Sequence, residues 1–442
     1  MERLTPLAYA FLAAEDVDPA ACLVIGSMAV LDGPAPSAEV LRELVARRLP
    51  VVPRYRQRVV PSRFGLRAPA WEDAPDLDLT QHVRVRAVPA PGGRAELAAV
   101  IAETMAERMD RDRPLWDLTV CDGLPDGRWG LLSRVHHAVA DGVSGTSLYR
   151  IVFDYEAAGA GPPPTPPGTA PGVAWQGLAA AATTTVRGAL ALGASLWPVR
   201  REGLLGRLDG ERRYAWTEVS IRETAAVRRE LGVTVNDLVL AAVAGGLREL
   251  LLERGHQPDP HALRTLLPVS SRPPGTAGDP DNQVTLMLAV LPVEVDDPVE
   301  RVLQVHERVA ALRRAHEPEA GVALQALAGL VPFPLLSRGI RWGLRFPQQQ
   351  IATVTTNVPG PHTPLTCLGR PVRQLLPVVP IADRVRLGFA VLSYVDSLTF
   401  GVTADAGSTP DVEQLAAGIG RSWRAVLDGR PAHGRPRAAG SG

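Results

Sequence analysis

The stretch Ser133–Gly142, SRVHHAVADG, decides how the first half of this 442-residue chain is organised. It follows the apolar run Trp129–Leu132, and the turn Pro125–Gly127 separates that run from an earlier one at Leu118–Cys121. Two apolar runs joined by a short turn that contains Pro and Gly are typical of a β-hairpin. Because successive side chains of a strand point to opposite faces, the two adjacent histidines of this stretch are expected to point in opposite directions. One of them could then serve chemistry while the other packs.

A histidine suits proton transfer near neutral pH, because its unperturbed pKa lies close to neutrality. Asp141 follows four residues after His137, and Gly142 would let the backbone approach another chain or a ligand closely. The alternative is that His136 and His137 are ordinary, partly buried residues and that Asp141 only caps the helix that follows. No cysteine or carboxylate lies beside the histidines at the spacing of metal ligands, so no zinc site is expected.

Composition limits the class of protein. The length suggests two or three domains, the 46% of hydrophobic residues is enough for a large core, and a formal net charge of zero gives no field that would attract nucleic acid. The three cysteines, Cys22, Cys121 and Cys367, lack motif spacing, which is typical of a reducing cytoplasm. The N-terminal segment does not resemble a secretory signal, and no long uninterrupted apolar run predicts a membrane span.

Two α/β units are expected, at residues 1–157 and 216–429, because short strands alternate with amphipathic helices in both. Residues 158–215 between them begin as a Pro/Gly/Ala-rich linker and continue as an apolar helical stretch. Residues 430–442 form a Pro/Gly/Arg-rich tail that is expected to fray.

Two apolar stretches allow more than one interpretation. Val173–Val199 is expected to be a crossover helix packed between the two units rather than a helix lying on a membrane surface. Gly321–Arg345 is expected to be a pair of core helices rather than a segment that meets lipid.

The second unit contains a helix start with a recognisable cap. Thr234-Val235-Asn236-Asp237 resembles a capping box, with Thr234 as the N-cap and Asp237 at the third helical position. Asn236 would lie in the first turn, where free backbone N–H groups can face a ligand.

Several stretches now occur together in one order, and they resemble the bacterial wax ester synthase/diacylglycerol acyltransferase family. That family belongs to the superfamily of CoA-dependent acyltransferases and peptide-synthetase condensation domains. The resemblance extends from Leu4 to about Leu427 and rests on the following stretches: Arg113–Trp116, His136–Gly142, Asn236–Ala241, Pro268–Ser270 with Arg272, Asn282–Val284, Asn357–Pro361 and Ser393–Tyr394. The HHxxxDG motif alone indicates only the superfamily, and the Pro-Leu-Trp and Asn-Asp motifs beside it indicate the family.

One stretch departs from the family pattern. Near the N-terminus the family usually shows a Ser-Pro-x-Asp-like sequence, whereas Thr5–Ala8 reads Thr-Pro-Leu-Ala. The role of that acid therefore cannot be transferred to Ala8.

The resemblance implies an α/β fold of two similar chloramphenicol-acetyltransferase-like lobes with a tunnel between them. His137 would lie in this tunnel as the general base, with His136 in a supporting role and Gly142 in the loop. Asp141 would be a structural carboxylate, held by an arginine such as Arg272. The substrate-binding residues that the resemblance implies are Pro114, Leu115, Trp116, Asn236, Asp237 and Asn282.

The implied reaction is a single-step acyl transfer from long-chain acyl-CoA, a co-substrate, to diacylglycerol or a fatty alcohol, with neither a metal nor a cofactor. His137 would take the hydroxyl proton and pass it to the departing thiolate. A serine hydrolase built on Ser133, Ser144 or Ser147 is less compatible, because no Gly-x-Ser-x-Gly elbow is present.

Such apolar substrates imply a cytoplasmic protein that associates peripherally with the inner membrane face or with lipid droplets. No nucleic-acid partner is expected. Two alternatives stay open. The chain could use a carrier-protein thioester or a specialised-metabolite alcohol, which the missing acid at Ala8 leaves open, or it could be a non-catalytic lipid-binding homologue, against which the intact His137, Asp141 and Gly142 argue.

Overall fold

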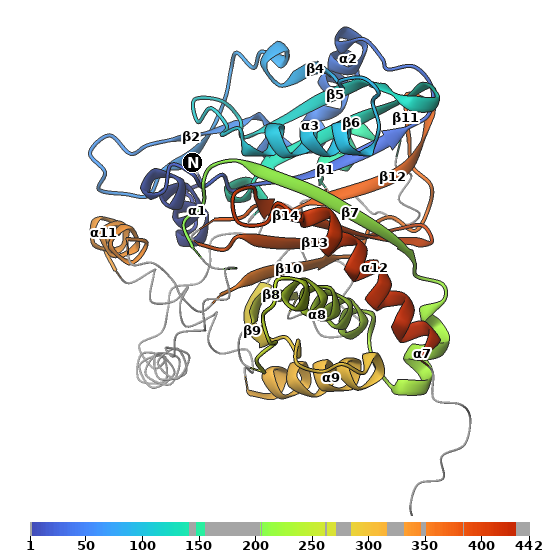
Figure 1. The fold of residues 1–442 in the computed structure, drawn as a ribbon. Coiled ribbons are helices and arrows are strands. Elements are labelled where there is room, and N and C mark those ends of the chain that lie inside the picture. Colours follow the sequence, from blue (N-terminus) through green and yellow to red (C-terminus); the bar gives the residue numbers. More distant parts are fainter. Residues whose placement is uncertain are drawn as a thin grey trace, which may run out of the picture.

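Two six-stranded sheets, stacked one on the other, form the centre of the molecule in this computed structural model (Figure 1). A two-stranded ribbon completes the strands described. The structure describes residues 2–140, 147–154, 204, 206–260, 263–270, 284–315, 331–345, 351–382 and 384–429. The expectations for Val173–Val199 and for the tail at 430–442 lie outside these residues.

The predicted hairpin is confirmed and lies inside the first sheet. Its strands are β5 (Trp116–Leu124) and β6 (Arg128–His136), which pair antiparallel across a short 3-10 turn at Pro125–Gly127. The complete strand order is β11-β12-β1-β6-β5-β4. The remaining strands are β1 (Val24–Leu31), β4 (Val83–Ala87), β11 (Thr366–Cys367) and β12 (Arg370–Val378).

The helices of the first lobe cover this sheet. Ser37 is the N-cap of α2, because its hydroxyl accepts from the N–H of Val40. One helix, α1, was not anticipated from the sequence. The elements other than the sheet strands are α1 (Pro6–Val17), α2 (Ala38–Arg48), β2 (Gln57–Val60), β3 (Ala70–Asp73), α3 (Arg94–Ala106), α4 (His137–Ala140) and α5 (Ser147–Val152).

The second sheet has the order β7-β14-β13-β10-β8-β9, with β10 parallel to both of its neighbours. Its strands are β7 (Arg212–Ser220), β8 (Arg264–Ser270), β9 (Val284–Val290), β10 (Thr353–Val358), β13 (Leu387–Tyr394) and β14 (Ser397–Asp405). The helices of this lobe are α7 (Thr224–Leu231), α8 (Val235–Glu253), α9 (Pro298–Ala315) and α12 (Val412–Asp428). A further helix, α11 (Phe333–Gly343), lies apart from them beside α1.

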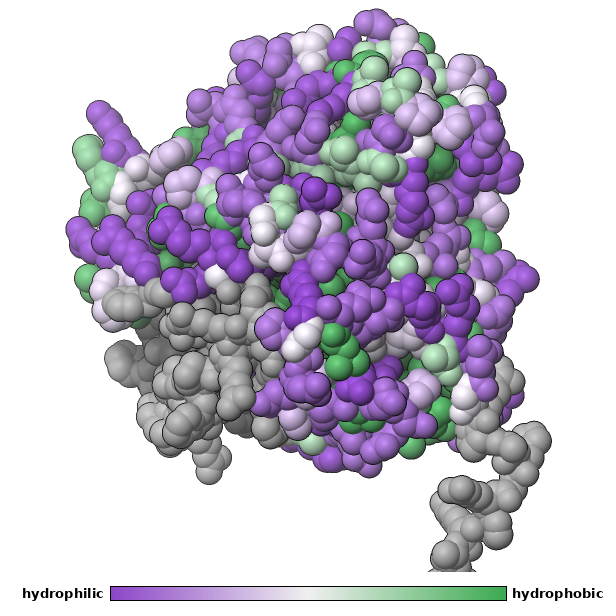
Figure 2. All heavy atoms as spheres, in the orientation of Figure 1, coloured by the Kyte–Doolittle hydropathy of each residue, from purple (hydrophilic) through white to green (hydrophobic). Residues whose placement is uncertain are grey.

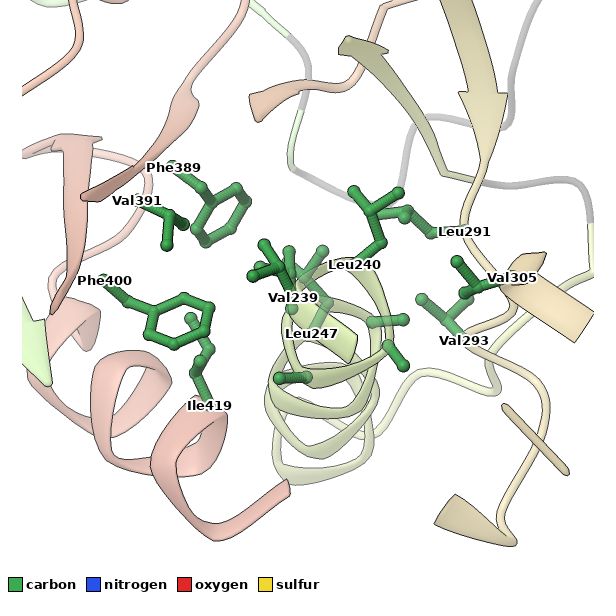
Figure 3. Packing of buried hydrophobic residues seen from close by; sticks show 14 of the residues in the cluster. Val239, Leu240, Leu247, Leu291, Val293, Val305, Phe389, Val391, Phe400 and Ile419 are labelled. Carbon is green, nitrogen blue, oxygen red and sulfur yellow. The ribbon is translucent and has the colours of Figure 1, made fainter. Parts of the chain in front are cut away.

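Helix α8 forms the centre of the second lobe's core. Figure 3 shows its apolar side chains between those of the sheet strands and α12 on one side and those near α9 on the other. Gly246 lets α12 approach closely, since a Cβ at this position would come within 2.9 Å of the backbone nitrogen of Ile419. Taken alone, no described helix is long and apolar enough to cross a membrane, although the sharply bent pair α7–α8 passes the same test on length and composition. Helix α8 is largely buried, so we assign it to the core of the second lobe.

Strand β12 joins the two lobes. It comes from the C-terminal half of the chain but pairs with β1 of the first sheet. Its Pro377 carbonyl accepts a hydrogen bond of 2.9 Å from the Tyr214 hydroxyl of β7. Gly401 of β14 has no room for a side chain here, because a Cβ would lie 2.0 Å from the same carbonyl oxygen. The first sheet is therefore completed by a strand from the C-terminal half of the chain, which the division into residues 1–157 and 216–429 does not include.

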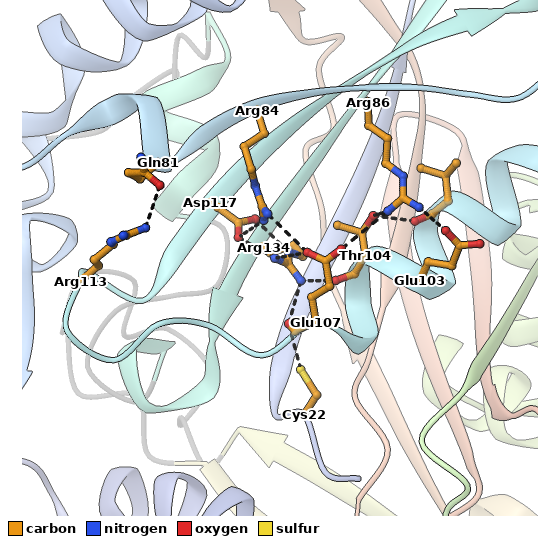
Figure 4. A network of polar contacts seen from close by, with 11 residues as sticks. Cys22, Gln81, Arg84, Arg86, Glu103, Thr104, Glu107, Arg113, Asp117 and Arg134 are labelled. Carbon is orange, nitrogen blue, oxygen red and sulfur yellow. Dashed lines mark hydrogen bonds and ion pairs between the residues drawn. The ribbon is translucent and has the colours of Figure 1, made fainter. Parts of the chain in front are cut away.

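A buried arginine fixes the hairpin to helix α3 (Figure 4). Arg134 of β6 is 1% exposed, and it donates to the two carboxylate oxygens of Asp117 on β5 at 2.8 and 2.6 Å. It also donates to the carbonyl oxygens of Thr104 and Glu107 at the end of α3. A buried charge needs such a full set of partners, so this network sets where β6 lies relative to α3.

Candidate active site at the end of strand β6

The two histidines lie where β6 ends and α4 begins. The N–H of His136 donates to the Leu115 carbonyl at 3.0 Å, and the N–H of His137 donates to the Leu23 carbonyl at 2.9 Å. The backbone of the histidine pair is therefore held by the chain on both sides of it, just before β5 and just before β1. Opposite directions for the two rings were predicted from the alternation of side chains along a strand. Strand β6 ends at His136, so this alternation does not extend to His137.

His136 is buried, and both of its ring nitrogens have a neighbour. The side chain is 1% exposed. Its Nδ1 accepts from the N–H of Ala138 at 3.0 Å, and its Nε2 lies 3.2 Å from a carboxylate oxygen of Glu15. Because Nδ1 accepts, the ring proton belongs on Nε2. The contact of Nε2 with the carboxylate oxygen is close, but its geometry does not meet that of a hydrogen bond.

His137 is less buried, and its ring stacks on Phe11 of α1, with ring centroids 4.8 Å apart and an interplanar angle of 25°. Burial lowers the pKa of His137 to about 4, and the neighbouring His136 lowers this pKa further. The imidazole is therefore neutral at pH 7, and one of its ring nitrogens is unprotonated, as a general base requires.

Helix α1 contacts both histidine rings, since Phe11 and Glu15 lie one turn apart on the same face. The helix begins at the Thr5 N-cap with Pro6 as its first residue, a start signal that the sequence contains. Glu15 is the site residue that sequence reasoning missed. No local pattern links it to His136, which lies far away along the chain.

The structure gives a physical meaning to the departure at Ala8. The Thr5 hydroxyl accepts from the N–H of Ala8 at 3.0 Å, which makes Ala8 the third helical position. An acid at this position would complete a capping box by accepting from the N–H of the N-cap residue. Its replacement by Ala8 therefore removes one capping interaction at the start of α1.

The Pro-Leu-Trp motif lies largely within the first lobe's core. Leu115 and Trp116 are 1% and 2% exposed, and the Trp116 indole donates to the Tyr55 carbonyl at 2.7 Å. His82 stacks on the same indole with centroids 4.5 Å apart. Pro114 is buried too, and borders a cavity of about 190 Å³. The substrate-binding role expected for this motif stays a prediction.

The predicted capping box of α8 is confirmed. The N–H and hydroxyl of Thr234 donate to one Asp237 oxygen at 2.8 and 2.9 Å, and the Asp237 N–H donates back to the hydroxyl at 3.2 Å. The same carboxylate oxygen lies 2.9 Å from Nδ1 of His306. Asp237 is 2% exposed and serves the helix start, whereas Asn236 beside it stays partly exposed.

The predicted residues divide into four groups, of which Pro114, Leu115 and Trp116 form one in the first lobe. His136 and His137 meet at α1, whereas Asn236 and Asp237 lie on the other lobe at the first turn of α8. Four further residues, Asp141, Gly142, Arg272 and Asn282, lie outside the described part of the chain. Within the part described, no group of three or more His, Cys, Asp and Glu side chains is placed to hold a metal ion.

The difference between Asp237 and Asn236 can be tested. We expect Asp237→Ala to lower the free energy of unfolding by about 1–2 kcal/mol, because it removes the capping interactions. Asn236→Ala should change this free energy by less than about 0.5 kcal/mol, because no cap is lost. Urea unfolding of the two variants measures both effects. Equal destabilisation by the two substitutions would contradict this assignment.

Comparison with known proteins agrees with this geometry. Residues 4–197 match the wax ester synthase/diacylglycerol acyltransferase catalytic domain, and residues 281–426 match the C-terminal domain of that family. The chain is 38% identical over 440 residues to a putative diacylglycerol O-acyltransferase of Mycobacterium bovis, covering 95% of this chain and 94% of the relative. A probable diacylglycerol O-acyltransferase of Mycobacterium tuberculosis matches with the same identity and coverage.

Solved structures show the same fold. The wax ester synthase/diacylglycerol acyltransferase from Marinobacter aquaeolei VT8 aligns with a TM-score of 0.70 and 26% identity, over 97% of this chain and 99% of that chain. The first condensation domain of the calcium-dependent antibiotic synthetase aligns with a TM-score of 0.60 and 16% identity, over 96% and 95% of the two chains, which shows the two-lobed fold alone. From its sequence matches and its architecture, this chain belongs to the wax ester synthase/diacylglycerol acyltransferase family.

Proposed function

We propose that the protein is an O-acyltransferase that transfers a long-chain acyl group from acyl-CoA to diacylglycerol or a fatty alcohol, with His137 as the general base. The main support is the neutral imidazole of His137 at the end of β6, in a chain whose relatives are named diacylglycerol O-acyltransferases. The family membership also argues against a carrier-protein thioester as the acyl donor.

The proposed reaction is one concerted exchange at the thioester carbonyl. The hydroxyl oxygen of the acceptor attacks the carbonyl carbon while His137 takes the hydroxyl proton. The new C–O bond forms, the C–S bond breaks, and the imidazolium returns the proton to the thiolate, which leaves as free CoA. Since the pKa of His137 is about 4, its imidazolium is a strong enough acid to protonate a thiolate, whose usual pKa is about 8.5.

A low pKa also makes His137 a weak base. Proton transfer to it must therefore accompany the attack on the carbonyl rather than precede it. General base catalysis of this kind contributes about 10²–10⁴-fold, and the positioning of both substrates supplies the rest of the rate. Ser133 is a poor alternative nucleophile, since it is 5% exposed and lies within β6 rather than on a strand-to-helix elbow.

Replacement of His137 tests this function. We expect His137→Ala to reduce kcat about 10²–10⁴-fold, because the base is lost, and to leave the circular dichroism spectrum unchanged. The assay supplies palmitoyl-CoA with either dipalmitoylglycerol or hexadecanol in detergent and measures free thiol and neutral lipid. His256→Ala, which removes an exposed histidine, is the matched control and should retain wild-type kcat. A His137→Ala variant as active as that control would refute the base, and no transfer by the wild-type protein would refute the function.

We further propose that the protein binds the surface of an anionic phospholipid bilayer, where its apolar substrates are found. Helix α11 supports this proposal. None of its residues is buried, so the core interpretation of Gly321–Arg345 is wrong for this part of the stretch. Leu335 and Trp342 are 59% and 64% exposed and lie seven residues apart, which places them on one face of the helix.

A second exposed segment lies beside the residues that precede α1. The loop between β2 and β3 contains Phe64 and Leu66, which are 74% and 64% exposed. This loop is tied to the residues before α1, because the Leu4 N–H donates to the Pro69 carbonyl at 2.9 Å. Helix α11 is held on α1 by contacts of Tyr9, whose ring meets that of Phe333 at 5.0 Å.

Figure 1 shows the β2–β3 loop, α1 and α11 along one side of the molecule, and Figure 2 shows hydrophobic and hydrophilic residues mixed there. Residues 61–69 and 333–345 contain arginines and no acidic residue, namely Arg63, Arg67, Arg338, Arg341 and Arg345. Exposed aromatic and leucine side chains among arginines are typical of a surface that binds anionic phospholipid. We call the exposed residues of segments 61–69 and 333–345 together the α11 face.

Vesicle binding tests the α11 face. We expect the triple variant Phe64→Ser, Leu66→Ser and Trp342→Ser to bind vesicles of phosphatidylglycerol and phosphatidylcholine at least tenfold more weakly than the wild type. The control is Leu252→Ser with Leu303→Ser, which changes two leucines of α8 and α9 that are 43% and 40% exposed and lie outside the α11 face. Vesicle flotation measures both. Wild-type binding by the triple variant, or equal loss in the control, would contradict the α11 face.

A further inference from the structure

Glu15 is a buried carboxylate to which the proposed reaction gives no role. Its side chain is 2% exposed, and on α1 it contacts the residue before β1 and the last residue of β6. One carboxylate oxygen accepts from the Leu23 N–H at 2.7 Å and lies 3.2 Å from Nε2 of His136. The other accepts from the Arg111 guanidinium at 3.2 Å.

These partners keep Glu15 ionised. Burial alone would raise the pKa of this carboxyl group, but His136, the Leu23 N–H and Arg111 together lower it to about 2. A buried charge is costly unless it is fully partnered, and an apolar side chain would fill the same space at lower cost. The position of this charge therefore favours a specific role over simple packing.

The contacts of Glu15 converge on the backbone and side chain that precede His137. Leu23 donates its N–H to Glu15 and accepts the N–H of His137 through its carbonyl. The Nε2 of His136 lies 3.2 Å from a Glu15 oxygen, while its Nδ1 accepts from the N–H of Ala138, the residue after His137. The carboxylate thus contacts Leu23, which binds the backbone of His137, and His136, which binds the backbone of the next residue. The His137 ring itself stacks on Phe11 of the same helix.

We propose that Glu15 is a positioning residue, which holds His136 as the Nε2–H tautomer and fixes Leu23 so that the His137 imidazole is aimed at the acceptor hydroxyl. The inference rests on the proposed function, because it gives Glu15 a role in that reaction. It does not require Glu15 to touch either substrate.

Three substitutions at two positions test the inference. Glu15→Leu removes both oxygens at similar size and should lower kcat at least about 10²-fold, because a displaced base loses its alignment. The KM for palmitoyl-CoA should stay within about twofold, since no substrate contact is lost. Glu15→Gln keeps an oxygen for Leu23 and His136 and should retain at least a tenth of wild-type kcat. Asp16→Asn is the matched control and should keep wild-type kcat, because Asp16 also binds Arg111, at 2.7 Å, but contacts neither Leu23 nor His136.

Each outcome decides between the possible roles. A wild-type kcat for Glu15→Leu, or a KM that rises while kcat is kept, would overturn the inference. If Glu15→Leu does not fold, Glu15→Gln decides, because a folded Gln variant with less than a tenth of wild-type kcat would also overturn it. Loss of kcat in Asp16→Asn equal to that in Glu15→Leu would assign the effect to Arg111 instead. Absence of transfer by the wild-type protein would refute the proposed function separately.

Discussion

The hydrogen bonds that hold the last residues of β6 are the constraint on which the candidate site depends. The amide groups of His136 and His137 donate to carbonyls that precede β5 and β1. The end of β6 therefore cannot shift without breaking these two hydrogen bonds. Further back on the same strand, Arg134 is bound to Asp117 and to the end of α3. The direction of the His137 ring is consequently set by the sheet as a whole rather than by a flexible loop.

The second constraint is strand β12, which belongs to the C-terminal half of the chain but pairs with β1 in the first sheet. An apolar cluster with side chains from both sheets lies where the sheets meet. It contains Tyr214 and Trp216 of β7 together with Met28 of β1 and Leu376 of β12. Arg94 at the start of α3 lies over the Trp216 ring at 3.9 Å from its centroid. The two lobes are thereby joined through side-chain packing and through a shared strand, which fixes the lobe that bears Asn236 relative to the lobe that bears His137.

Local patterns predicted the elements whose signals are local. The β5–β6 hairpin was predicted from two apolar runs and a turn, and the capping box of α8 from Thr234 and Asp237. Helix α1 was missed because it is apolar on most sides, so periodicity does not mark it, and its best signal is the Thr5-Pro6 start. Strand β12 and the pairing of Glu15 with His136 depend on residues that are distant in sequence, and no local pattern records such contacts.

The acid limb of the pH dependence of kcat/KM for the wild-type protein tests the central claim most directly, since kcat/KM reports the pKa of the base in the free enzyme. Burial lowers the pKa of His137 to about 4, so the base stays unprotonated until the pH falls to that value. We therefore expect kcat/KM to remain constant from pH 8 to about pH 5 and to fall with a midpoint near pH 4, with circular dichroism confirming that the protein stays folded. An acid limb with its midpoint near 6.5, the ordinary value for histidine, would contradict His137 as a base whose pKa is lowered by its surroundings.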